Sequence, residues 1–206
     1  MKYRAEVDGL RAVAVLPVIF FHSGFSLFSG GYLGVDVFFV ISGYLITSIL
    51  LSEIRGGDFS IAKFYVRRVR RIIPALLVVL YLSSIVACIV LIPSQLRDFG
   101  QSVVATNAFS ANIFFWLKLD YWGQAAEFIP LIHMWSLGVE EQFYLIFPLF
   151  LVLIVRLNSI TKLLVLATLS SFVGMVIAQK LGYMSESFYL APFRAWELGV
   201  GAVVAS

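Results

Sequence analysis

The chain is dominated by apolar runs long enough to cross a lipid bilayer, which takes about 17 to 25 residues. Its 206 residues are 61% hydrophobic and only 13% charged, which leaves too little polar surface to cover a water-soluble core. We therefore expect an all-α fold, a polytopic bundle of transmembrane helices with about six spans and one interfacial or re-entrant helix. The expected spans are 11–28, 32–51, 72–92, 134–155, 163–180 and 188–205.

A seventh apolar run, 101–117, decides the topology. The segment between the second and third spans is rich in arginine, so the positive-inside rule places it in the cytoplasm together with the N-terminus. If 101–117 does not cross the membrane, Arg156 and Lys162 also fall on the cytoplasmic side. We therefore expect this run to lie in the interface or to re-enter, with the stretch 93–133 capping the outer face of the bundle.

The first span carries three ionisable residues, Asp8, Arg11 and His22, which lipid would penalise unless they face protein, water or a ligand. Arg11 and His22 are about three helical turns and about 16 Å apart, so their side chains share one face. Asp8 lies one turn before Arg11 on the same side. This face could hold a long ligand with a polar head.

The second span contains several glycine and serine residues, and Asp36 lies near its outer membrane boundary. Gly34 and Gly43, with Ser42, indicate close packing against another helix in preference to a ligand-lining role, although both interpretations stay open.

Four arginines precede the third span, at positions 67, 68, 70 and 71. On a helix Arg67 pairs with Arg70, and Arg68 pairs with Arg71, so that either pair could bind a phosphate. A topological signal that also contacts anionic lipid explains the cluster equally well. Pro74 is expected in the first turn of the helix that follows.

The fourth span begins with ionisable and polar residues: His133, Glu140, Glu141 and Gln142. Adjacent positions on a helix point about 100° apart, so at most one of the two carboxylates can face a buried site. The other carboxylate is expected toward solvent or a neighbouring helix. His133 is interpreted mainly as an interfacial residue.

Five motifs together carry a family resemblance. They read DGLRAVAVLPVIFFH, GGYLGVDVFFVISGYLI, FYVRRVRRIIPA, WSLGVEEQFYL and FRAWELGVGA, and they follow one another over nearly the whole chain. In order and spacing they resemble the acyltransferase-3 family of bacterial membrane O-acetylases. The resemblance implies a multi-pass protein of the bacterial inner membrane that transfers acyl groups from acyl-CoA to hydroxyls of cell-surface glycans such as lipopolysaccharide or peptidoglycan.

The resemblance also assigns site residues. The family's arginine and histidine, separated by ten residues, fall on Arg11 and His22, and its glutamate falls on Glu140. Its pair of arginines falls on Arg68 and Arg71, with Arg67 and Arg70 as a second possible register. We list Asp8, Asp36, Arg67, Arg70, Gln142, Arg194 and Glu197 as supporting residues.

A histidine with an ordinary pKa near 6.5 suits proton removal from a sugar hydroxyl, so we expect His22 to be the base. Glu140 would orient the imidazole if the first and fourth spans pack together. Arg11, Arg68 and Arg71 would grip the phosphates of acetyl-CoA. A role for His22 as a transient acyl carrier is equally compatible with the sequence.

Residues 1–206 are expected to form the N-terminal part of an acyltransferase-3 domain of about ten spans, so the chain alone could be inactive. The absent partners would be further spans and a periplasmic domain resembling SGNH esterases, which the ending FRAWELG suggests. We expect acyl-CoA, a glycan or lipid-linked sugar acceptor and the bilayer as partners, without a metal or nucleic acid. The alternatives are a transporter or flippase and a non-catalytic assembly subunit.

Overall fold

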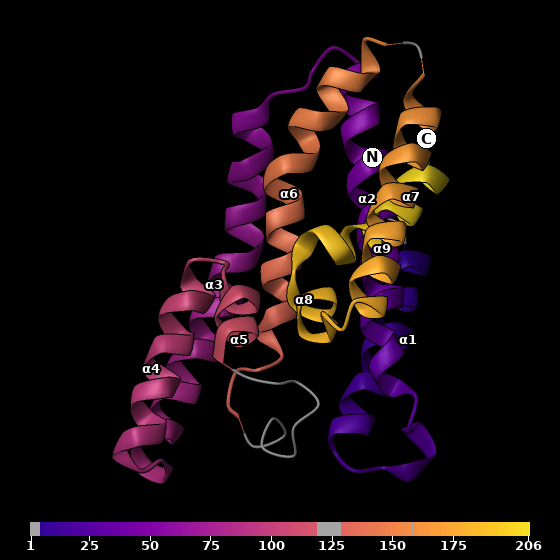
Figure 1. The fold of residues 1–206 in the computed structure, drawn as a ribbon. Helices are drawn as coiled ribbons and strands as arrows, with labels where there is room; N and C mark the ends of the chain where they lie inside the picture. The colour runs from indigo at the N-terminus through magenta and orange to yellow at the C-terminus, as the bar shows by residue number, and fades with distance from the viewer. Residues whose placement is uncertain (1–4, 119–128, 158) are drawn as a thin grey trace.

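The structure is a computed structural model that describes residues 5–118, 129–157 and 159–206. Within these ranges the regular elements are all helical (Figure 1). They are α1 (Ala5–His22), η1 (Ser26–Phe28), η2 (Gly31–Leu33), α2 (Gly34–Arg55), α3 (Ile61–Val90), α4 (Pro93–Asn107), α5 (Ala111–Lys118), α6 (Met134–Val155), α7 (Ile160–Lys180), α8 (Met184–Tyr189) and α9 (Ala191–Ala205).

Four helices of the described part of the chain are long and apolar enough to cross a membrane: α2 with η2, α3, α6 and α7. The first expected span, 11–28, is shifted toward the N-terminus: α1 also has 18 residues, but it ends at His22, and the chain turns at Gly24, whose φ is +79°. The last expected span corresponds to α9, which has 15 residues. The all-helical membrane fold is thus confirmed, while membrane crossing by α1 and α9 stays a prediction.

The third long helix starts earlier than expected. Ser60 caps α3, because its side chain accepts a hydrogen bond from the backbone N–H of Lys63. From there the helix continues through Pro74 to Val90, so the expectation that Pro74 lies in a first turn is wrong. A proline removes only one backbone hydrogen bond, which a long membrane helix tolerates. The four arginines therefore lie within the first half of α3.

The ambiguous run 101–117 does not form one helix. It is divided between α4, with 15 residues, and α5, with eight, and the break contains Phe109 at a φ of 51°. Figure 1 shows α4 beside the later part of α3. Neither helix is long enough to cross a bilayer, which agrees with the expectation that this run is interfacial or re-entrant.

Contacts with glycines bring α2 close to α1 and α9. A β-carbon at Gly43 would lie 1.9 Å from the carbonyl oxygen of Leu198, and one at Gly201 would lie 1.9 Å from that of Val40. A β-carbon at Gly34 would lie 2.0 Å from the carbonyl oxygen of Ala14. The packing interpretation of these small residues is therefore confirmed.

The outward faces of the bundle are apolar. Only 17% of the apolar window of α3 and 6% of that of α7 are buried, although both helices are strongly hydrophobic. Such surfaces suit contact with lipid chains, which are as apolar as leucine.

Helix α2 connects the two ends of the bundle. Asp36 lies in its first turn and Glu53 near its last, about 26 Å apart along the axis. The ends of α1 and α7 and the starts of α2, α6 and α9 gather around Asp36, whereas the loop 56–60 and the start of α3 lie beside Glu53. The ionisable residues divide between these two ends.

Candidate functional site

The imidazole of His22 is held by its own helix. Its Nδ1 lies 2.8 Å from the carbonyl oxygen of Val18, one turn earlier. A carbonyl can only accept a hydrogen bond, so in the neutral ring Nδ1 carries the proton and Nε2 keeps its lone pair. This is the tautomer that a general base needs.

His22 lines an open cavity of about 440 Å³, the His22 cavity, at the Asp36 end of the bundle. Aromatic side chains form much of its wall, among them Tyr32, Phe38, Trp135 and Phe188. Its polar and ionisable lining residues are His22, Asp36, His133, Ser136, Gln179 and Arg194.

His133 is a second imidazole in this cavity and precedes the first residue of α6. Burial lowers its pKa below the ordinary value, and the neighbouring His22 lowers it further. The residue keeps part of its surface exposed to solvent.

Arg194 forms the most constrained part of the wall. Its Nη2 donates to Oδ1 of Asp36, and its Nη1 lies 3.0 Å from Oε1 of Glu197, which is fully buried. The guanidinium also lies 5.5 to 5.9 Å from the ring centres of Phe39, Trp135 and Phe188. These contacts link α9 to α2 and α6 and leave the arginine little freedom.

A second group, the arginine cluster, consists of Arg11, Arg68, Arg71, Glu140 and Tyr144. The Tyr144 hydroxyl donates to Oε1 of Glu140, one turn earlier on α6. The guanidinium of Arg68 lies over the Tyr144 ring, 4.7 Å from its centre. Arg68 from α3 and Glu140 from α6 are thus brought together through one tyrosine.

Arg11 joins this cluster from α1. It interacts electrostatically with Arg71, Tyr144, Glu140 and Asp8. Its Nε is buried without a hydrogen-bond partner among the described residues. Arginines from two helices are thus brought near Glu140, with Asp8 beside Arg11 and Glu141 beside Arg68, and several guanidinium groups gathered in this way can bind an anion.

The second pair of arginines, Arg67 and Arg70, has a different environment. Nη2 of Arg67 donates to both carboxylate oxygens of Glu53, at 2.8 and 2.9 Å. Arg70 is exposed on the surface of α3. Arg71 is exposed as well, and Arg67 already has a partner, so the assignment of Arg68 and Arg71 as the ligand-binding pair stays a prediction.

Glu140 and His22 are assigned to different groups. In the described part of the chain no hydrogen bond or ion pair joins them, since Glu140 binds Tyr144 and His22 binds Val18. The role of Glu140 as orienting group for His22 stays a prediction.

Gln142 links α6 to neighbouring residues through side-chain hydrogen bonds. Its side-chain amide and that of Asn112 donate to each other, at 2.9 and 3.3 Å, and Gln142 also donates to the Phe109 carbonyl. Gln142 therefore joins α6 to α5 at the break in the 101–117 run. Neighbouring Glu141 is partly buried, and its Oε1 has no hydrogen-bond partner among the described residues.

Several residues of these groups escaped the sequence analysis, among them Tyr144 and Trp135. Tyr144 lies four residues after Glu140, a spacing that places both on one helical face and could have indicated their hydrogen bond. Trp135 could not have been assigned, because its contact with Arg194 depends on how α6 and α9 pack.

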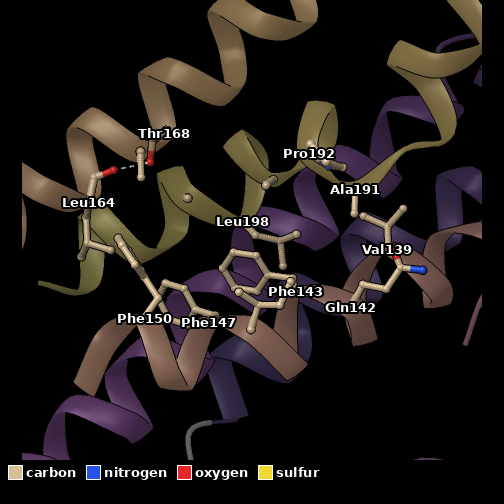
Figure 2. A pocket seen from close by; sticks show the side chains of 14 residues that line it. Val139, Gln142, Phe143, Phe147, Phe150, Leu164, Thr168, Ala191, Pro192 and Leu198 are labelled. Carbon is tan, nitrogen blue, oxygen red and sulfur yellow. Dashed lines mark hydrogen bonds between the residues drawn. The ribbon is translucent and has the colours of Figure 1, made fainter. Parts of the chain in front are cut away.

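A further cavity of about 410 Å³ lies between α6, α7 and α9 (Figure 2). Figure 2 shows Phe143, Phe147, Phe150 and Leu198 in its wall, with Gln142 at one side and Thr168 at the other. None of its lining residues is titratable. It is therefore unsuited to acid–base chemistry.

Comparisons with known proteins identify the family of the chain. The acyltransferase domain family Acyl_transf_3 matches residues 4–206. The chain is 39% identical over 214 residues to "Putative peptidoglycan O-acetyltransferase YrhL" of Bacillus subtilis (strain 168), covering 99% of the chain and 33% of that protein. It is 37% identical over 212 residues to "O-acetyltransferase OatA" of Staphylococcus aureus (strain NCTC 8325 / PS 47), covering 99% of the chain and 34% of that protein.

The chain therefore spans about a third of the length of these relatives. No solved structure matches it significantly. The family match and the two relatives confirm the resemblance inferred from the five motifs.

Proposed function

Because the chain belongs to the Acyl_transf_3 acyltransferase domain family, we propose that it transfers an acetyl group from acetyl-CoA to a hydroxyl of a cell-envelope glycan. The observation that carries the proposal is the His22 imidazole, whose Nε2 is left free for proton transfer in an open cavity. The names of the two relatives support acetyl as the acyl group, and YrhL supports peptidoglycan as the acceptor.

The donor would bind at the arginine cluster. The phosphates of coenzyme A would contact the guanidinium groups of Arg11, Arg68 and Arg71, whose planar forks suit phosphate oxygens. Arg11 and His22 are about 16 Å apart along α1, so an extended pantetheine arm can carry the thioester toward the His22 cavity.

The transfer itself needs one proton acceptor. Nε2 of His22 removes the proton of the acceptor hydroxyl as its oxygen attacks the thioester carbonyl. The new carbon–oxygen bond forms, the carbon–sulfur bond breaks, and the departing thiolate receives the proton from the imidazolium. Acetylated glycan and free coenzyme A are the products, and His22 returns to its starting state.

The acyl-carrier role of His22 can be separated from the base role. With radiolabelled acetyl-CoA and no acceptor, a carrier would leave protein-bound label that disappears in His22→Ala, whereas a base would leave none. We expect no label, because direct transfer to the acceptor hydroxyl needs no covalent intermediate.

The orientation follows from charge. The arginine-rich start of α3 and the loop 56–60 would face the cytoplasm with the N-terminus, so the His22 cavity would open outside the inner membrane. Leu27, which is 88% exposed in η1, and Ser159 before α7 lie at opposite ends. In a Cys88→Ala background we expect an impermeant thiol reagent to label Leu27→Cys in intact cells and not Ser159→Cys; the opposite pattern would reverse the orientation.

Activity is tested with the protein that carries this chain, reconstituted in vesicles with radiolabelled acetyl-CoA on one side and soluble peptidoglycan disaccharides on the other. We expect label on the disaccharide with wild-type protein and none with His22→Ala. Movement of the disaccharide without acetyl-CoA would indicate a transporter. Absence of both activities in the folded wild-type protein would support a non-catalytic subunit.

A further inference from the structure

The His22 cavity is lined by two kinds of side chain to which the proposed transfer step assigns no role. Its lining includes the aromatic side chains of Tyr32, Trp135 and Phe188 and the polar side chains of Asp36, Ser136 and Gln179. An apolar ligand would leave these polar groups unpaired, at a cost in affinity. A ligand that presents both hydroxyls and a C–H surface would match both kinds of side chain.

One oxygen of the Asp36 carboxylate is bound by Arg194, and the side chain still lines the cavity. Its Oδ1 accepts from Nη2 of Arg194, and the Asp36 side chain is nevertheless 31% exposed in the cavity wall. Arg194 is only 11% exposed and is held by Glu197 and by three aromatic rings. The carboxylate is therefore fixed in orientation before any ligand arrives, which reduces the entropic cost of binding.

The cavity between α6, α7 and α9 provides an internal comparison. It has nearly the same volume, about 410 Å³ against 440 Å³, and lies in the same bundle. Its lining contains no charged residue, whereas the His22 cavity contains a fixed carboxylate and a guanidinium. The polar groups around Asp36 are thus a particular property of the His22 cavity and not a general feature of cavities in this protein.

We propose that the His22 cavity is the binding site of the acceptor, that the acceptor is a sugar ring with neighbouring hydroxyls, and that Asp36 binds one of those hydroxyls. This inference rests on the proposed acetyl transfer and names a residue for its acceptor. Oδ2 of Asp36 accepts the hydrogen bond, the aromatic wall contacts the C–H face of the ring, and a second hydroxyl lies toward Nε2 of His22. Arg194 is a positioning residue, because it acts through Asp36.

The test compares Asp36→Asn with Asp98→Asn in the vesicle assay, with peptidoglycan disaccharide as acceptor. Asparagine keeps the shape and an oxygen for Arg194 but loses the charge. We expect the acceptor KM to rise about tenfold or more in Asp36→Asn, as for the loss of one charge-assisted hydrogen bond. Asp98, on α4 beside Lys118 and 63% exposed, is the matched control and should leave the acceptor KM unchanged.

The split between KM and kcat separates binding from other roles. A fall in kcat with an unchanged acceptor KM would make Asp36 a residue that serves His22, and it would overturn the inference. An equal rise of the acceptor KM in Asp98→Asn would also overturn the inference, because the effect would then not be specific to Asp36.

A second variant covers the case in which Asp36→Asn fails to fold. Gln179, at the end of α7, is exposed on the cavity rim, so Gln179→Ala can be expected to fold. We expect a smaller rise of the acceptor KM, about threefold, with the dissociation constant for coenzyme A unchanged. An unchanged KM in this variant would count against the cavity as acceptor site.

Failure of the inference is distinguishable from failure of the proposed function. If wild-type protein transfers acetyl to the disaccharide while both variants keep its KM, the function stands and the acceptor binds elsewhere. If wild-type protein transfers nothing, the proposed function itself fails.

Discussion

The arginine cluster and the His22 cavity share helices α1 and α6, yet they have opposite character. The cluster brings arginines from two helices near Glu140, and its Arg11 Nε has no hydrogen-bond partner among the described residues. In the cavity, the one arginine is already bound by Asp36 and Glu197. Several guanidinium groups close together suit a polyanionic ligand, whereas a neutralised wall with aromatic rings suits an uncharged one.

Helix α1 joins the two regions. Arg11 belongs to the cluster and His22 to the cavity, so α1 sets the distance between the proposed phosphate site and the proposed base. Mutations should therefore separate binding of the donor from proton transfer, provided that the helices that carry both regions stay in place.

The largest expected effect belongs to the cavity. His22→Ala should lower acetyl transfer by at least about a hundredfold, because general base catalysis is lost. The dissociation constant for coenzyme A, measured by calorimetry on the detergent-purified protein, should stay within about twofold, since the phosphates bind elsewhere. A large loss of coenzyme A binding would show that the two regions are not separate.

A change in the common scaffold should impair both regions together. A β-carbon at Gly43 would collide with the backbone of Leu198, so Gly43→Ala should destabilise the protein by about 1 to 3 kcal/mol. Gly100, on α4, has open space around it, and Gly100→Ala is the matched control. Thermal unfolding monitored by tryptophan fluorescence measures the difference; equal melting temperatures for the two variants would refute the close contact between α2 and α9.

The cluster should respond to the geometry of its cations. Arg71→Lys keeps the charge but loses the planar fork, so the dissociation constant for coenzyme A should rise about tenfold. Arg70→Lys is the matched control on the exposed side of the same helix, with an expected change of less than about twofold. If Arg70→Lys has the larger effect, the second register of arginines is the functional one.

The smallest expected effect is a dependence on pH that belongs to the cavity alone. Burial and the neighbouring His22 lower the pKa of His133 below its ordinary value of 6.5. Just below pH 6.5 this histidine is therefore protonated more fully in the unfolded chain than in the folded protein. Stability should therefore fall as pH drops below about 6.5, and His133→Gln should remove part of this fall. Melting temperatures between pH 5 and pH 8, roughly the range in which histidine titrates, provide the measurement. An identical pH profile in the variant would contradict it.

Much of the local structure follows directly from the sequence. Apolar runs of bilayer length predict the long helices, and the spacing between Arg11 and His22 places them on one helical face, because helix geometry depends only on neighbours along the chain. The five motifs indicate the family for the same reason. The start of α3 was missed, since Ser60 provides a cap that lies well before the apolar run.

The arrangement of the site depends on tertiary structure. The sequence places Asp36 and Arg194 158 positions apart, and only the close crossing of α2 and α9 brings them together. The pairing of Glu140 with Tyr144 and Arg68, and of Arg67 with Glu53, likewise required the packed helices. Periodicity determines which face of a helix a residue occupies, but the rotation and depth of each helix against its neighbours decide which faces meet. The sequence by itself thus determined the helices and their candidate residues, and packing divided those residues between the arginine cluster and the His22 cavity.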